Sequence, residues 1–76
     1  MMPHYHIDVF WWPEDELWVA NVPDLSGCSA HGATPADAIR EVGIAMELWL
    51  ETAAEYGDPI PVPRYRSEIS TFARAA

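Results

Sequence analysis

Lysine is absent from this sequence, and basic residues of any kind are scarce. Four arginines are set against twelve aspartates and glutamates, which gives the chain a formal net charge of −8. Because proteins bind phosphate backbones largely through Lys and Arg, so acidic a chain is not expected to bind nucleic acid directly. Its charge favours a basic partner instead.

Two further absences concern the compartment. The chain has a single cysteine, Cys28, so no disulfide framework can form within it, which fits a reducing cytoplasm. The N-terminus lacks the basic segment and long apolar run of a signal peptide. No stretch reaches the roughly 18 apolar residues of a membrane span. We therefore expect a cytoplasmic protein without a membrane partner.

Apolar residues, by contrast, are plentiful. They make up 50% of the 76 residues and include four tryptophans. A chain of this length forms one domain, and a core this small buries only about 60% of the surface of the unfolded chain. The apolar content exceeds what such a core needs, so the sequence predicts self-association into a homodimer or tetramer.

Alternating polarity predicts an antiparallel hairpin near the start of the chain. The first strand is expected over residues 4–12 and the second over 17–22, joined by the polar turn 13–16. The first strand has two faces, one with Tyr5, Ile7, Val9 and Trp11 and the other with His4, His6, Asp8, Phe10 and Trp12. The second strand is apolar on both faces, with Leu17 and Val19 on one and Trp18, Ala20 and Val22 on the other. One face should therefore pack on a helix and the other on another subunit.

A turn and a short third strand follow the hairpin. Pro23 cannot donate to a strand ladder and Gly27 permits a positive φ, so the chain turns between them. Asp24 is expected to close this turn by accepting a hydrogen bond from a nearby backbone N–H. Residues 28–31 are long enough for a short strand after the turn.

One long helix is predicted after the third strand. Thr34 is the expected N-cap, Pro35 the first helical residue, and Asp37 complements the positive end of the helix dipole. The pattern continues to Tyr56, and Gly57 is a suitable C-cap. The apolar stripe at helical spacing consists of Ala38, Ile39, Val42, Ala45, Met46, Trp49, Leu50, Ala53 and Tyr56. The predicted fold is α+β: a three-stranded antiparallel sheet with one helix packed across it.

The C-terminal part divides at residue 63. Alternating prolines keep residues 58–63 extended, and residues 1–63 form the predicted domain. Residues 64–76 form a short tail, either a short helix after Ser67 or a frayed end, and the sequence favours neither.

A few polar residues are candidates for chemistry. His4 and His6 could reach one metal from the same strand face, joined by His31, but a His-x-His pair is more often an ordinary polar edge. Asp8 lies in the first predicted strand, where its carboxylate could bind a metal ion, although metal-dependent hydrolysis needs several clustered carboxylates. Cys28 is better explained as a small buried thiol than as a nucleophile. No catalytic residue, metal or cofactor is predicted, and a metal-dependent hydrolase using Asp8 with His4 and His6 is the less favoured alternative.

Exposed apolar residues form a more promising set. Ile44 and Leu48 lie four apart on the polar side of the predicted helix, where they are either scattered apolar residues or a contact patch. Aromatic side chains dominate the binding energy of protein interfaces. The hairpin is expected to expose four of them, Phe10, Trp11, Trp12 and Trp18. The predicted partner or oligomer interface comprises Phe10, Trp11, Trp12, Leu17, Val19, Ile44 and Leu48.

The run W-V-A-N-V-P-D-L-S-G-C-S-A-H-G-A-T-P-A-D-A-I, residues 18–39, resembles the signature of HicB-like antitoxins. That signature is an aromatic or apolar strand ending in A-x-x-P-D-L-x-G-C-x-A-x-G-x-T-x-x-E-A. The later E-L-W-L-E, Y-G and I-P-x-P also match, so the resemblance covers about residues 5–63. Asp37 replaces the usual Glu and keeps the charge at the helix start.

The resemblance implies a truncated ribonuclease-H-like fold and an antitoxin role. The partner would be a small, basic, messenger-RNA-cleaving toxin whose active surface the antitoxin covers, and an acidic chain suits that task. Many family members carry a C-terminal DNA-binding module, but only thirteen residues follow Pro63 here, too few for such a module. Operator binding is therefore not expected. An orphan oligomeric scaffold with another partner is the alternative.

Overall fold

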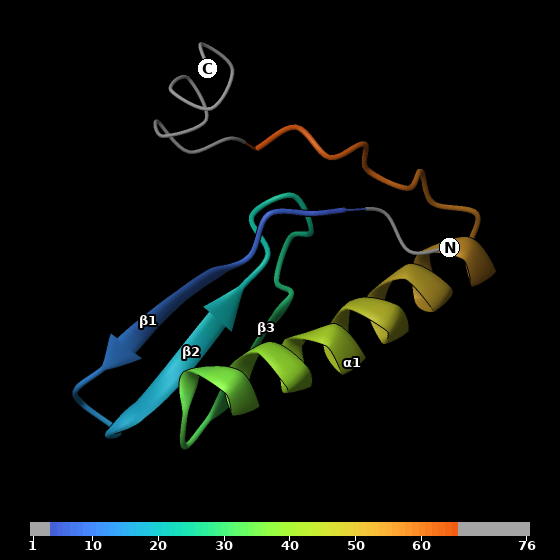
Figure 1. The fold of residues 1–76 in the computed structure, drawn as a ribbon. Coiled ribbons are helices and arrows are strands. Elements are labelled where there is room, and N and C mark those ends of the chain that lie inside the picture. Colours follow the sequence, from blue (N-terminus) through green and yellow to red (C-terminus); the bar gives the residue numbers. More distant parts are fainter. Residues whose placement is uncertain (1–3, 66–76) are drawn as a thin grey trace, which may run out of the picture.

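A computed structural model describes residues 4–65 of the chain. Three strands form an antiparallel sheet in the order β1-β2-β3, and one helix lies across one face of the sheet (Figure 1). The elements are β1 (Asp8–Trp12), β2 (Leu17–Asn21), β3 (Ser29–Gly32) and α1 (Pro35–Glu55). The predicted α+β fold, with a three-stranded antiparallel sheet and one helix, is confirmed.

The strands are shorter or shifted relative to the prediction. β1 pairs with β2 from Asp8↔Asn21 to Trp12↔Leu17, so the expected strand start at His4 is wrong. Residues 4–7 have no strand partner because β2 ends at Asn21, opposite Asp8. β3 begins one residue later than expected, because the N–H of Cys28 donates to the carbonyl of Leu25 within the preceding turn. The alternation of polar and apolar residues therefore extends beyond the residues that pair with a neighbouring strand.

The helix begins and ends at local signals. The Oγ1 of Thr34 accepts a hydrogen bond from the N–H of Asp37 at 3.1 Å, and Pro35 occupies the first helical turn. The helix ends one residue before the predicted Tyr56, a difference within the usual uncertainty of helix boundaries. Gly57 then adopts a φ of +72°, which is the left-handed conformation that glycine permits after a helix.

The core lies between α1 and the sheet. Its buried members come from the segment before β1, from β2, from the β2–β3 loop and from α1, and they comprise Tyr5, Ala20, Val22, Leu25, Cys28, Ala38, Val42 and Met46. Two residues of the predicted helical stripe do not join them, since Ile39 is 46% exposed and Tyr56 is 77% exposed. Ile39 lies at the margin of the buried stripe and Tyr56 lies beyond the last helical turn, so the expectation was wrong for both.

The end of β3 meets the first turn of α1 at close range. A Cβ atom placed on Gly32 would lie 2.6 Å from the Cβ of Asp37 and 2.7 Å from the backbone nitrogen of Ala38. Real Cβ atoms do not approach other atoms this closely. Gly32 therefore sets how near the helix packs to the sheet.

An extended segment, residues 58–65, follows the helix and runs back past the β2–β3 loop (Figure 1). The Oδ2 of Asp24 accepts hydrogen bonds from the N–H groups of Arg64, at 3.0 Å, and Tyr65, at 3.1 Å. The expected role of Asp24 in closing its own turn was therefore wrong. Backbone groups close that turn, with the N–H of Leu25 donating to the carbonyl of Val22. The Asp24 carboxylate binds the N–H groups of residues 64 and 65 instead.

Two N-terminal residues, Tyr5 and His6, also contact the extended segment. The hydroxyl of Tyr5 donates to the carbonyl of Pro61, and the rings of His6 and Tyr65 lie 4.5 Å apart between centroids. We call residues 58–65 with these contacts the clasp segment. The helix or tail considered after Ser67 lies outside the described residues.

Candidate partner-binding surfaces

The face of the sheet turned away from α1 is rich in apolar side chains. Phe10 and Trp12 are 40% and 42% exposed there, with ring centroids 6.2 Å apart. Val19 pairs with Phe10 and Leu17 pairs with Trp12 across the β1–β2 ladder, so the four side chains share one face. A shallow hollow of about 380 Å³ lies beside them, and Trp12, Leu17, Val19 and His31 contribute to its lining. We call Phe10, Trp12, Leu17 and Val19 the outer sheet patch.

Trp11 belongs to a different surface. It pairs with Trp18 across the hairpin, and the two rings meet edge to face at 5.5 Å between centroids. Trp18 is half-buried and packs against the core, so the expectation that it is an exposed aromatic was wrong. Trp11 itself is 45% exposed. The predicted interface residues are thus not one contiguous set.

Ile44 and Leu48 lie on a third surface, the outer side of α1. They are 58% and 63% exposed, among the most exposed large apolar residues of the helix. Glu41, Glu51 and Glu55 are also exposed on this helix. The sequence left two interpretations of Ile44 and Leu48 open, scattered apolar residues or a contact patch. A hollow beside Leu48 favours the contact patch.

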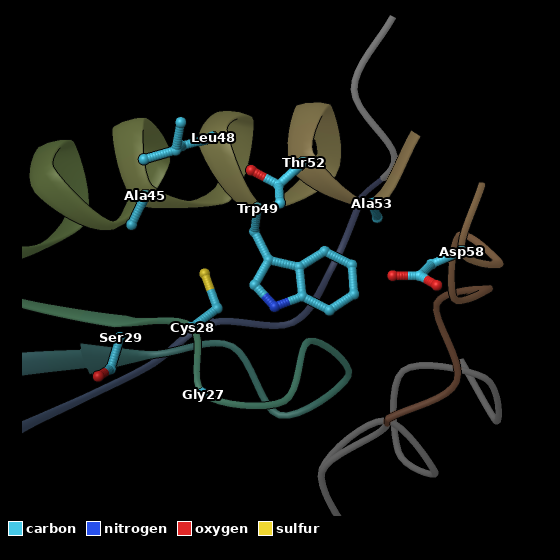
Figure 2. Close-up of a pocket in the computed structure, with 9 residues that line it drawn as sticks. All are labelled: Gly27, Cys28, Ser29, Ala45, Leu48, Trp49, Thr52, Ala53 and Asp58. Carbon is cyan, nitrogen blue, oxygen red and sulfur yellow. The ribbon is translucent and has the colours of Figure 1, made fainter. Parts of the chain in front are cut away.

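A hollow of about 410 Å³ adjoins Leu48 between α1 and the loop that leads into β3 (Figure 2). The indole of Trp49 extends from the helix toward this loop, and its Nε1–H donates to the carbonyl of Ser26 at 3.0 Å. The lining is Gly27, Cys28, Ser29, Ala45, Leu48, Trp49, Thr52, Ala53 and Asp58. Sequence reasoning missed this hollow because it placed Trp49 in the core; the indole N–H, which needs a partner when buried, was the available signal.

The residues considered for chemistry do not assemble into a site. The Nε2 of His6 lies 2.6 Å from the Oδ1 of Asp8, while His4 is exposed ahead of β1. Within residues 4–65, no three His, Cys, Asp or Glu side chains converge as metal ligands. Cys28 is buried, and burial raises the pKa of its thiol, which disfavours the reactive thiolate. Within residues 4–65, Asp8 therefore lacks the cluster of carboxylates that a metal-dependent hydrolase would need.

The charge of the described surface is dominated by carboxylates. Arg40 and Arg64 are the arginines among residues 4–65. The guanidinium of Arg40 lies 3.1 Å from Asp37 and 3.8 Å from Glu41, so it is already engaged on the helix. Among these same residues, no helix is both long and apolar enough to cross a membrane.

Comparison with known proteins identifies the family. A sequence model described as "HicB_like antitoxin of bacterial toxin-antitoxin system" matches residues 5–74. The UPF0150 protein ssl0259 of Synechocystis sp. is 41% identical over 44 residues, which are 58% of this chain and 60% of the relative. The UPF0150 protein Ta0767 of Thermoplasma acidophilum is 33% identical over 48 residues, 63% of this chain and 70% of the relative.

The match thus spans less than two thirds of the Synechocystis relative. No solved structure is similar enough to this chain to count as a match. The family match, however, covers nearly the whole chain and includes every element of the described fold. The chain therefore belongs to the HicB-like antitoxin family of bacterial toxin–antitoxin systems.

Proposed function

We propose that this protein is a non-enzymatic antitoxin that neutralises a small, basic, messenger-RNA-cleaving toxin by covering its active surface. The observation that carries the proposal is the family match over residues 5–74. The toxin would act on messenger RNA, so the cytoplasm is the proposed compartment. No metal, cofactor or direct contact with nucleic acid is part of this function.

The electrostatics of the chain support a basic partner. A net charge of −8 on 76 residues creates a field that attracts a cationic protein and repels RNA. Complementary charge accelerates association and selects among partners, and salt screens it. An acidic protein of this kind competes with RNA for the basic surface of a nuclease.

We further propose that the outer sheet patch mediates self-association into a homodimer or tetramer. Two half-exposed aromatic rings and two aliphatic side chains are concentrated on one face of the sheet, which is the composition of an interface core. Trp11 would extend the contact at the hairpin. The division of the chain at residue 63 and the interface assignments remain predictions.

The proposed neutralisation is tested with purified components. The probe is the product of the small basic reading frame nearest the gene, assayed for cleavage of a messenger RNA while this protein is added in increasing amounts. We expect cleavage to stop near equimolar protein, and the inhibition to weaken as salt is raised. Unchanged cleavage at a large excess of this protein would refute the antitoxin role and leave an oligomeric scaffold with another partner.

Self-association is tested separately by light scattering. Val19→Asp places a charge in the outer sheet patch and should reduce the mass to that of the monomer. Val62→Asp is a matched control, since Val62 is 62% exposed in the clasp segment. An unchanged mass for Val19→Asp would contradict the assignment of this face.

A further inference from the structure

A line of six side chains runs along the outer side of α1 with an unusual distribution of charge. The residues are separated alternately by four and three positions, which places them on one helical face, and they are Asp37, Glu41, Ile44, Leu48, Glu51 and Glu55. Its centre, Ile44 and Leu48, is apolar and its two ends are acidic. We call these six residues the helix stripe.

We propose that the helix stripe, with the hollow beside Leu48, is the docking surface for a basic amphipathic segment of the partner protein. This inference rests on the proposed function for the identity of the partner and adds to it the place and the chemistry of the contact. An apolar side chain of the partner would contact Ile44 and Leu48 or enter the hollow. Lys or Arg side chains on either side would pair with the acidic ends.

The apolar centre of the stripe is not used by the fold. Ile44 and Leu48 are 58% and 63% exposed, whereas Val42 and Met46 on the opposite side of the helix are buried. The adjoining hollow is framed on its far side by the backbone of the Gly27–Ser29 loop and at one end by Asp58 (Figure 2). It thus combines apolar walls with a carboxylate, the features that suit a side chain with an apolar stem and a cationic head.

The C-terminal acidic end of the stripe is unfavourable in the isolated chain. Glu51 and Glu55 occupy the last two turns of α1, where the helix dipole is negative, and no basic residue lies in the last turn. Neither forms an ion pair with another of residues 4–65. A cation bound at this end would relieve the repulsion with the dipole, so a basic partner gains more here than at an already paired carboxylate.

The same charges argue against a second copy of this chain on the stripe. A symmetric contact brings the same surface of both copies together, so an antiparallel pair would set Asp37 and Glu41 against Glu51 and Glu55. Like charges in such register repel. Arg40 offers little compensation because it already contacts Asp37 and Glu41. A second copy fits the less charged outer sheet patch better.

The proposal is tested by measuring toxin affinity of paired variants with calorimetry at low and physiological salt. Leu48→Ser should weaken binding by about tenfold or more, whereas its matched control Val62→Ser should leave it within about twofold. Glu51→Gln with Glu55→Gln should weaken binding and reduce its salt dependence, unlike Glu14→Gln with Glu16→Gln in the exposed hairpin turn. Equal effects of the test and control variants would overturn the proposal. Thermal melts of each variant confirm folding.

A second probe separates failure of the site from failure of the proposed function. If the unmodified protein does not bind the toxin, the function fails and the surface is tested with a synthetic helical peptide carrying leucines flanked by lysines. Methyl NMR signals of Ile44 and Leu48 should then shift on titration, and Leu48→Ser should abolish the shifts and the binding. Shifts confined to other residues, no binding, or a lowered oligomer mass for Leu48→Ser would each refute the proposal.

Discussion

Replacing Gly32 by alanine should severely destabilise the fold, although it adds a single methyl group. The new Cβ would lie 2.6 Å from the Cβ of Asp37, 2.7 Å from the backbone nitrogen of Ala38 and 2.8 Å from the backbone carbon of Asp37. Two of these atoms belong to the helix backbone, so no side-chain rotation relieves the clash. The helix must move away from β3, which opens the contacts of Ala38 and Val42, both fully buried.

The magnitude follows from the cost of overpacking. Forcing an extra methyl group into a packed region costs about 1–3 kcal/mol, and a displaced backbone places this substitution at about 3 kcal/mol. Proteins are stable by only about 0.05–0.15 kcal/mol per residue, so much of the stability of a chain this small would be lost. The melting temperature should fall by about 12–24 °C.

The control is the same substitution at Gly43. A Cβ on Gly43 meets nothing within 4 Å, and glycine in a helix interior costs about 1 kcal/mol relative to alanine. Gly43→Ala should therefore raise the melting temperature while Gly32→Ala lowers it. Circular dichroism melts and urea titrations at one fixed protein concentration measure both, since association alters apparent stability. If Gly32→Ala unfolds within about 0.5 kcal/mol of the unmodified protein, the argument from close approach is wrong.

Three further predictions concern capping, the clasp segment and pH. Thr34→Ala should lower the unfolding free energy by about 1 kcal/mol in urea titrations, and Thr34→Ser should restore most of it; equal stability of the two would contradict the capping role. Asp24→Ala should leave the sheet intact but speed limited proteolysis after Arg64, because both backbone hydrogen bonds to the carboxylate are lost. Burial raises the pKa of Cys28, so the folded state holds this proton more tightly than the unfolded state. The stability that this proton contributes is present below the ordinary thiol pKa of 9.0 and is lost as the pH rises through the pKa of Cys28 in the folded state. Cys28→Ala should therefore reduce the fall in melting temperature at alkaline pH. Identical pH profiles for Cys28→Ala and the unmodified protein would refute this explanation.

The helix could be predicted from the sequence because its limits depend on neighbouring residues. Thr34, Pro35 and Gly57 act within a turn of their own positions, and the structure places the helix between them. Strand limits depend on a partner elsewhere in the chain. The alternation that begins at His4 says nothing about where β2 ends, so the first strand was predicted four residues too early.

The candidate surfaces were harder to predict for a related reason. Exposure of a side chain depends on where the helix crosses the sheet, which periodicity does not determine. Alternation places Trp11 and Trp12 on opposite faces of the strand, but it does not show that Trp18, which contacts Trp11, is half-buried against the core. The partner of Asp24 lies some forty residues along the chain, and no local rule links the two.

The clasp segment has a consequence for the order in which the chain acquires its structure during synthesis. The hairpin, β3 and the start of α1 involve contacts between near neighbours in sequence, so they can assemble as soon as those residues leave the ribosome. The hydrogen bonds that Asp24 and Tyr5 form with the clasp segment cannot form until residues 61–65 have been translated. A newly made chain therefore passes through a stage in which the sheet and helix are in place but the segment after the helix is still open to proteases. In the finished chain, the susceptibility of this segment to proteases would depend on how often those late contacts open.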